Sequence, residues 1–499
     1  MKITLISPYP DITAYGLRIL SAYLRENGHR ARILFLPDPL GDDLQFGIER
    51  YTPEVLKQVA ELCQDEDLIG ITLMTNHFDP AQQITRQLKA SQVKAPIIWG
   101  GVHPTSRPEE CLEYCDMVCV GDGEESLLEL ADRMEKGEDY TSVPNIHIKN
   151  GDTVVKNGIR ALTKDLDTFP MPDYGVKDHF IIHEGQVIPM TLDLMKHFLQ
   201  CGTVSGYIGA IGYQMMTGRG CPHKCSYCFN DKIKGLYEGQ VYLRWRSTES
   251  IMQELEWVKE NMPFVGFVWI SDDAFFARNR KNLREFCDEY KKRIGLPFSC
   301  LASPLTISEE KMEMLVDAGL VYVQMGIQSG SAKMQDLYNR KKMSNRLVLK
   351  ATHIINKYKD KMVPPSYDFI LDAPNETTDD VVESLRLIAD LPKPFKLQPF
   401  AMVLYPGTKL YDMSKEQGLI QDENKEIYNK SYTMREYNYL NLLITLSKGG
   451  KFPGGLLKFL VSPMVLAIFN NRAMEPFIRA FYMMLKSANH SVKMVMGRA

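Results

Sequence analysis

The sequence predicts an α/β protein with a doubly wound parallel sheet, a partial βα barrel of six units, and a small helical region at the end. Short apolar runs alternate with amphipathic stretches over residues 1–140 and again over residues 213–406. Such alternation is typical of parallel sheets covered by helices. A chain of 499 residues is also long enough for about three domains. We therefore expect a first domain at 1–140, a connector at 141–212, a barrel at 213–410 and a helical region at 411–499.

The composition is that of a globular protein. Hydrophobic residues make up 44% of the chain and charged residues 24%, which excludes a disordered or fibrous protein. The formal net charge is −3, so we expect no nucleic acid partner. Ten cysteines are too few for a disulfide framework in a chain of this length, and no signal-peptide pattern precedes the first apolar run. We expect a cytoplasmic protein with reduced thiols.

Five apolar runs predict the strands of the first sheet, at residues 3–7, 31–36, 68–73, 96–99 and 117–120. Amphipathic stretches predict helices at residues 15–26, 53–63, 81–90 and 124–135. Ligands of such sheets bind beyond the carboxyl ends of the strands. Small and polar residues follow those ends, at 8–11, 75–77, 100–104 and 121–124. These residues form either a ligand site or simple turns. No G-x-G-x-x-G motif follows the first run, so a dinucleotide ligand is disfavoured.

Three of these segments resemble the cobalamin-binding domain of a large class of radical enzymes: residues 70–75, the Gly-Gly-Val-His-Pro-Thr run from Gly100, and residues 120–124. The resemblance implies cobalamin contacts at Tyr9, Thr13, Thr72, Thr75, Asn76, Gly100, Gly101, His103, Gly121, Gly123 and Glu124. Residues 11–16 resemble the D-x-H-x-x-G cobalamin motif, with Thr13 in the histidine position. Because a hydroxyl is a poor cobalt ligand, we expect cobalt without a protein ligand on its lower face. His103 is the alternative ligand.

Residues 141–212 contain turn signals and short alternating pieces. This pattern predicts a hairpin and an extended connector. The histidines of this region, His179, His183 and His197, have no regular spacing, so we expect them at the surface.

Cys221, Cys225 and Cys228 form a C-x3-C-x2-C motif after the strand-like residues 212–217. Thiolates are the ligands of iron–sulfur clusters, and three of them leave one iron of a four-iron cluster open for a substrate. A zinc site would need a fourth ligand, and His223 lies inside the motif at an unusual spacing for zinc. Cys111, Cys115 and Cys119 could suggest a second cluster, but their spacing fits buried small apolar residues better. The scattered Cys63, Cys201, Cys287 and Cys300 are expected to be structural.

The cysteine spacing, with Tyr227 before the third cysteine, resembles the radical S-adenosylmethionine (SAM) superfamily. The resemblance implies that SAM chelates the open iron and is cleaved by one electron to methionine and a 5′-deoxyadenosyl radical. It also implies an open, TIM-like barrel with its chemistry at the carboxyl ends of the strands. An electron donor such as flavodoxin or ferredoxin is then an expected partner.

The barrel pattern predicts strands at residues 265–270, 298–302, 321–325, 366–371 and 396–403, and helices at 248–260, 280–293, 309–318, 346–358 and 378–389. The segments that follow these strands resemble the family's SAM contacts. The resemblance implies that SAM is bound by Tyr227, Asp272, Asp273, Gln328, Ser329, Asp372 and Pro374. The chain departs from the family where Gln328 replaces a glutamate and where Asp372 and Asn375 replace glycines. Many relatives bind the SAM carboxylate with an arginine on the third strand, and this chain has none there. Arg244, Arg246 and Lys342 are three alternative candidates for that role.

Residues 447–499 are basic and apolar, with eight basic residues against Glu475 alone. The longest apolar run, 459–471, is too short to cross a bilayer as a helix. One interpretation is a helical cap on the barrel. The alternative is a surface that contacts the inner face of an anionic membrane or admits a lipid-like substrate.

The two resemblances together imply a cobalamin-dependent radical SAM enzyme, similar to the class that methylates unactivated carbon. Such an enzyme would use one SAM molecule to form methylcobalamin and a second to generate the 5′-deoxyadenosyl radical, acting on a small-molecule or lipid-like substrate. Two alternatives stay open. One is a cyclase or rearrangement enzyme with the same cofactors, and the other is a non-catalytic corrinoid or iron–sulfur binding protein. The sequence does not identify the catalytic side chain.

Overall fold

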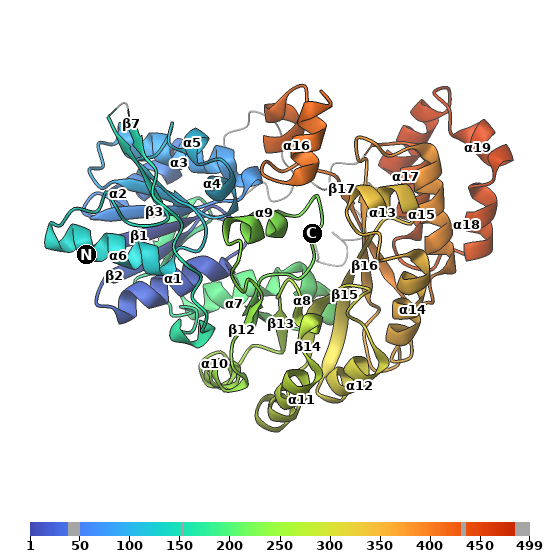
Figure 1. The fold of residues 1–499 in the computed structure, drawn as a ribbon, viewed down its shortest axis with the longest axis horizontal. Coiled ribbons are helices and arrows are strands. Elements are labelled where there is room, and N and C mark those ends of the chain that lie inside the picture. The colour runs from blue at the N-terminus through green and yellow to red at the C-terminus, as the bar shows by residue number, and fades with distance from the viewer. Residues whose placement is uncertain (38–49, 152, 431–435, 485–499) are drawn as a thin grey trace. The chain divides into compact units, whose positions relative to one another are not determined.

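The computed structural model describes residues 1–37, 50–151, 153–430 and 436–484 (Figure 1). The chain divides into two compact units. The first unit comprises Met1–Cys300, Asp317–Gly319 and Val403–Ser431, and the second comprises Leu301–Val316, Leu320–Met402 and Tyr432–Ala499. The domain boundaries expected from the sequence stay a prediction.

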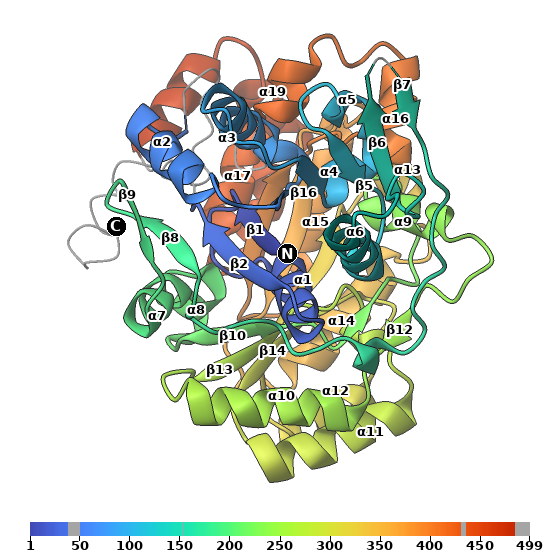
Figure 2. The same cartoon turned by 90° about the vertical axis from the view of Figure 1, so that its left-hand side faces the viewer.

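The first unit contains a nine-stranded sheet in the order β7-β6-β5-β4-β3-β1-β2-β8-β9. Its central strands run parallel, and they are β1 (Lys2–Ser7), β2 (Arg30–Phe35), β3 (Leu68–Thr72), β4 (Ile97–Gly100) and β5 (Met117–Cys119). Figures 1 and 2 show α2 (Pro53–Leu62) and α3 (Phe78–Ala90) on one face, and α1 (Tyr15–Glu26) and α6 (Glu124–Lys136) on the other. The short helices α4 (Val102–Ser106) and α5 (Pro108–Cys111) follow β4. The predicted doubly wound sheet is confirmed.

Residues 141–212 extend this sheet at both edges. The hairpin of β6 (Ile146–Asn150) and β7 (Thr153–Val155) pairs antiparallel with β5. At the other edge, β8 (Phe180–His183) runs parallel to β2 and pairs antiparallel with β9 (Gln186–Pro189). Helices α7 (Leu192–Gln200) and α8 (Thr203–Ile208) follow.

The surface position expected for His179 is wrong. Its imidazole is buried: Nδ1 accepts a hydrogen bond from the Ile33 amide at 2.9 Å, and Nε2 lies 3.0 Å from Asp173 Oδ2. The sequence pattern missed this position because both contacts join residues far apart in the chain.

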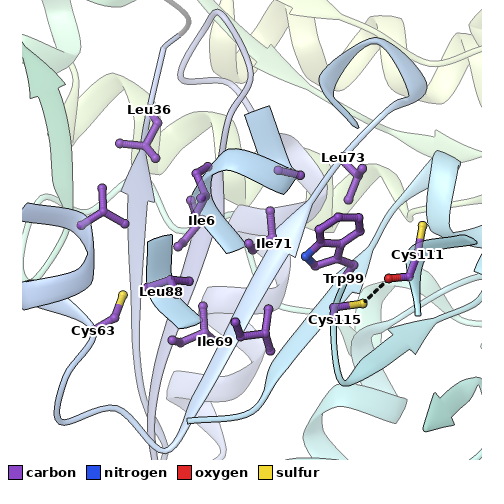
Figure 3. Close-up of a cluster of buried hydrophobic side chains, with 14 of the residues drawn as sticks. Ile6, Leu36, Cys63, Ile69, Ile71, Leu73, Leu88, Trp99, Cys111 and Cys115 are labelled. Carbon is purple, nitrogen blue, oxygen red and sulfur yellow. Dashed lines mark hydrogen bonds between the residues drawn. The ribbon is translucent and has the colours of Figure 1, made fainter. Parts of the chain in front are cut away.

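The sheet face under α2 and α3 is a packed core. Alternate strand residues point into it, including Ile6, Ile69 and Trp99. Cys63, Cys111 and Cys115 belong to the same cluster, and the Cys115 thiol donates to the Cys111 carbonyl at 3.1 Å (Figure 3). Cys111 and Cys115 are buried apolar residues, as predicted.

All six strands expected of the barrel form. In the first unit, β10 (Gly212–Met215), β13 (Phe267–Ile270) and β14 (Phe298–Ala302) run parallel, with helices α10 (Thr248–Asn261) and α11 (Arg280–Glu289) between them in the chain. In the second unit, β15 (Leu320–Gln328), β16 (Ser366–Leu371) and β17 (Lys396–Ala401) also run parallel. The remaining barrel helices are α12 (Glu309–Asp317), α13 (Ala332–Leu337), α14 (Asn345–Asn356) and α15 (Thr378–Asp390).

Helices continue after the last barrel strand. Helix α16 (Lys409–Glu416) belongs to the first unit, and α17 (Tyr439–Ser447), α18 (Gly454–Leu460) and α19 (Pro463–Phe469) belong to the second. Helices α17 and α18 both pack on α15. Across the described residues, every helix is too short or too polar to cross a bilayer.

Candidate functional site

The cysteine motif lies in the loop between β11 (Gly218–Arg219) and α9 (Phe229–Leu236). Pairing of β11 with β12 (Arg244–Trp245) fixes the start of this loop. Cys221 and Cys225 are buried, and Cys228 is half-buried and directly precedes α9. The positive end of the α9 dipole therefore favours negative charge at the last sulfur. Tyr227 is half-buried between the second and third cysteines.

Two thiols of the motif, those of Cys221 and Cys228, need a metal to ionise. Burial raises the pKa of Cys221 to about 12 and that of Cys228 to about 11, and the charge of Asp273 adds to both shifts. Thiols with such pKa values stay protonated at neutral pH unless a metal ion supplies positive charge.

Three cysteines are the donor set of a four-iron cluster with one open iron. Among the described residues, no three His, Cys, Asp or Glu side chains are arranged to hold one metal ion. In a four-iron cluster each cysteine binds a different iron, so the three sulfurs need not converge on one point.

The two acidic residues that follow β13 have different surroundings. Asp272 is 1% exposed, and its carboxylate accepts hydrogen bonds from the Thr217 amide at 2.5 Å and the Gly218 amide at 3.3 Å. Burial raises the pKa of this carboxyl to about 6. Asp273 is exposed, and its side chain is hydrogen-bonded to Asn230, two residues after Cys228. Because Asp272 is buried and its oxygens are already hydrogen-bonded, the exposed Asp273 is the better candidate of the predicted pair for the SAM amino group.

The SAM residues predicted in the second unit lie at the ends of its strands. Gln328, at the end of β15, has φ +75°, and Asp372, directly after β16, has φ +58°. These left-handed conformations strain any residue except glycine, which explains why a glycine suits the position of Asp372 in the family motif. Asp372 Oδ1 accepts from Asn441 Nδ2 at 2.8 Å. Ser329 is buried with its hydroxyl 3.2 Å from that of Ser384, and Pro374 is exposed before α15.

Two of the three basic substitutes for a SAM-carboxylate ligand are already engaged. Arg244 Nη1 donates to the Thr163 carbonyl at 2.6 Å, and Arg246 forms an ion pair with the buried Glu254. Lys342 is exposed in the second unit.

A cavity of about 540 Å³ lies in the first unit, walled by the sheet together with α1 and α6. A void of this size is far larger than the gaps of a packed interior and falls in the range of ligand pockets. Its wall includes seven of the predicted cobalamin residues: Tyr9, Thr72, Gly100, Gly101, Gly121, Gly123 and Glu124.

Two glycines of the wall occupy positions where any side chain would be strained and crowded. Gly101 has φ +110°, and a Cβ there would lie 2.7 Å from the Leu73 carbonyl oxygen. Gly121 has φ +85°, and its Cβ would overlap the Tyr237 hydroxyl. The backbone can therefore form the cavity wall at these turns because both residues lack a side chain.

Four predicted cobalamin residues, Thr13, Thr75, Asn76 and His103, are not among those that line the cavity. The Thr13 amide and hydroxyl both donate to Asp11 Oδ1, which closes a local turn. His103 is fully buried, with Nδ1 3.2 Å from Thr75 Oγ1 and its ring 4.8 Å from that of Phe78. Burial lowers the pKa of His103 to about 3, so it is a neutral core residue here.

Sequence reasoning missed the sheet face of the cavity, which Leu5, Gly70, Ile98 and Cys119 supply. Their neighbours Ile6, Ile69 and Trp99 point to the packed core on the other face. A glycine inside a buried strand is a signal for close approach of a ligand, and Gly70 gives that signal. Leu17, Leu20 and Leu127 also line the cavity, but the sequence carries no signal for this. An apolar residue that lines a ligand cavity has the same sequence pattern as one that packs in the core.

The cavity is tied to the cysteine segment within the same unit. Met216 and Arg219 line it, and Cys221 follows only two residues after Arg219. Arg219 forms ion pairs with Glu124 and Asp122, and Arg244 Nη2 lies 3.1 Å from Asp122 Oδ2. The Asp122 amide donates to the Tyr237 hydroxyl at 2.8 Å. The loop of residues 121–124 is therefore held by side chains on either side of the cysteine motif.

Comparison with known proteins supports the same two components. The B12 binding domain family matches residues 1–131, and the radical SAM superfamily matches residues 215–388. An uncharacterized methyltransferase of Pyrococcus horikoshii is 24% identical over 420 residues, which are 83% of this chain and 81% of that protein.

Solved structures share the fold. The radical SAM methyltransferase TsrM of Kitasatospora setae, solved with tryptophan and a SAM analogue, is 16% identical with a TM-score of 0.64, and the match covers 83% of this chain and 76% of TsrM. The cobalamin-dependent radical enzyme OxsB, solved with aqua-cobalamin and SAM, is 15% identical with a TM-score of 0.64, over 98% of this chain and 71% of OxsB. The predicted fold class and cofactor set are confirmed.

Proposed function

We propose that this chain, which belongs to the cobalamin-binding radical SAM enzymes, methylates an unactivated carbon of a small-molecule or lipid-like substrate. Its cofactors are a [4Fe–4S] cluster, SAM and cobalamin. The cluster supplies the electron that cleaves SAM, and cobalamin carries the methyl group.

The observation that carries this proposal is the shared segment between the cavity and the cysteine motif. Arg219 lines the cavity, and Cys221 is two residues further along, a distance that extended chain spans in about 7 Å. Hydrogen removal and methyl transfer must reach the same substrate carbon, so the two cofactor sites have to be neighbours. The ion pairs of Arg219 with Glu124 and Asp122 hold these parts of the chain together.

Each group of side chains then has a distinct task. In this proposal Cys221, Cys225 and Cys228 bind the cluster, and Asp273 binds the amino group of SAM. The cavity binds cobalamin, with the backbone turns at Gly101 and Gly121 on one side and the apolar face of the sheet on the other. The apolar face excludes water from the bound cofactor.

Product analysis tests the proposal. Anaerobically reconstituted protein would receive SAM with a deuterated methyl group, a reductant, and separate small-molecule and lipid fractions of cell extract. Methylation predicts S-adenosylhomocysteine and 5′-deoxyadenosine together, with the label in a new product. Ring formation or rearrangement predicts 5′-deoxyadenosine without S-adenosylhomocysteine, and a non-catalytic protein predicts neither. Either of the last two results overturns methylation.

Two partners complete the proposal. Cleavage of SAM needs an electron, and a flavodoxin or ferredoxin is the proposed donor. Peripheral contact with a membrane is proposed through residues 447–499, of which 485–499 lie outside the described residues.

A further inference from the structure

Large exposed apolar side chains gather near the end of the described chain. Nine of the eighteen in the described residues lie between 456 and 484: Leu456, Phe459, Met464, Ile468, Phe469, Phe477, Phe481, Met483 and Met484. Phe477 is 69% exposed and Met464 is 67% exposed. Scattered exposed apolar residues are normal on a soluble protein, but a cluster of this kind marks an interaction surface.

The helical residues 475–484 show that this exposure follows a pattern. Ile478 and Tyr482, four residues apart, are buried, and the Tyr482 hydroxyl lies 3.1 Å from Thr445 Oγ1 of α17. Phe477, Phe481 and Met484 follow the spacing of a second helix face, and all three are exposed. The helix is therefore fixed to the protein through one apolar face while a second apolar face meets solvent.

The two preceding helices repeat this arrangement. In α18, Leu457 is buried while Leu456 and Phe459 are exposed, and Figure 1 shows α19 next to it. In α19, Val465 is buried while Met464 and Ile468 are exposed. We call the exposed apolar side chains of residues 456–484 the C-terminal apolar surface.

The charges that residues 447–484 themselves carry are almost all positive. Between residues 447 and 484, Glu475 is the single acidic residue, against Lys448, Lys451, Lys458, Arg472 and Arg479. Lys458 is paired with Asp390 at 2.6 Å, and Arg479 lies 5.9 Å from the centre of the Tyr437 ring. Arg472 and Lys451 are exposed and form no ion pair with any described residue. A partner of this surface should therefore be apolar and negatively charged.

We propose that the C-terminal apolar surface docks on an anionic phospholipid membrane. Exposed Phe, Leu and Met side chains between basic residues are typical of helices that lie in the membrane interface. A second copy of the chain fits less well, because it would bring Arg472, Arg479 and Lys451 against like charges. Docking would hold the protein at a source of lipid-like molecules, but it does not depend on the proposed reaction.

Flotation of the intact, cofactor-loaded protein tests this surface. Wild-type protein should float with vesicles of phosphatidylcholine and phosphatidylglycerol, and much less with phosphatidylcholine alone. The double variant Phe477→Glu/Phe481→Glu should lose flotation. Leu192→Glu is the matched control, because Leu192 is a 44% exposed residue in the first turn of α7, outside this surface, and this variant should float like wild type.

A second variant isolates the charge. Arg472→Gln/Arg479→Gln should weaken partition into anionic vesicles about thirtyfold at low salt and leave the circular dichroism spectrum unchanged. The proposal is overturned if wild-type protein stays at the bottom of the gradient, or if Phe477→Glu/Phe481→Glu and Leu192→Glu float equally. It is also overturned if light scattering shows a wild-type dimer that the double variant dissolves, since the surface would then join two copies.

Discussion

The ion pair between Arg219 and Glu124 allows a quantitative test of how the cavity loop is held. The Glu124 side chain is 6% exposed and that of Arg219 is 21% exposed. Burial disfavours the charge of Arg219, but Glu124 and Asp122 more than offset this and hold its pKa above its ordinary value. Replacing Arg219 by Met would leave a buried carboxylate without its partner, which costs about 3–5 kcal/mol of unfolding free energy.

The control for this change is Arg293→Met, also in the first unit. Arg293 pairs with Glu249 and Glu256, whose side chains are 60% and 40% exposed. Water screens these carboxylates after the arginine is removed, so the loss should be much smaller. Both variants replace an arginine by methionine, and they differ in how deeply the carboxylates left without a partner are buried.

Urea denaturation of the apoprotein, followed by circular dichroism, would measure both changes. The double variant Arg219→Met/Glu124→Gln removes the unpaired charge, so it should be more stable than the sum of the single changes by about 1–3 kcal/mol. The reasoning fails if Arg219→Met costs no more than Arg293→Met, or if the double variant shows no such coupling.

Three further predictions follow from single sites. Replacing Cys221, Cys225 and Cys228 by Ala should abolish bound iron and 5′-deoxyadenosine while cobalamin still binds, whereas Cys201→Ala, an exposed cysteine outside the motif, should change neither. Gly16 lines the cavity with no atom within 4 Å of an added Cβ, so Gly16→Trp should weaken cobalamin binding in a titration, while Gly206→Trp, equally unobstructed in α8, should not. Burial holds the pKa of His103 at about 3, so the unfolded chain binds a proton there that the folded chain does not. Stability should fall by about 1.4 kcal/mol per unit as pH drops below about 6.5, and denaturation of His103→Gln at each pH should lack that part of the slope. Equal slopes for the two proteins would contradict the buried neutral histidine.

Periodicity predicted the elements well where local pattern and final burial agree. The strand expected at 366–371 and the helix expected at 15–26 have those bounds in the structure. Periodicity could not predict contacts between residues that are far apart in the chain. The pairing of β8 with β2 and the burial of His179 against Asp173 depend on such contacts. Nothing local in the sequence marks either one.

The candidate site was predicted in outline, but not its inner surface. Motif spacing located the cysteines and the glycine turns of the cavity. It could not tell that Asp272 is hydrogen-bonded to the Thr217 and Gly218 amides while Asp273 stays exposed, because the two are adjacent and chemically alike. Nor could it separate Leu20, which lines the cavity, from Leu24, which is core. Both are apolar residues of the same amphipathic helix.

The central claim is that the three cysteines hold a four-iron cluster with one iron open to SAM. Electron paramagnetic resonance of the reduced cluster, recorded on one anaerobic sample before and after addition of SAM, tests it most directly. A change in the spectrum on addition of SAM is expected. A spectrum that SAM leaves unchanged, or a protein that takes up zinc in place of iron, would contradict the account.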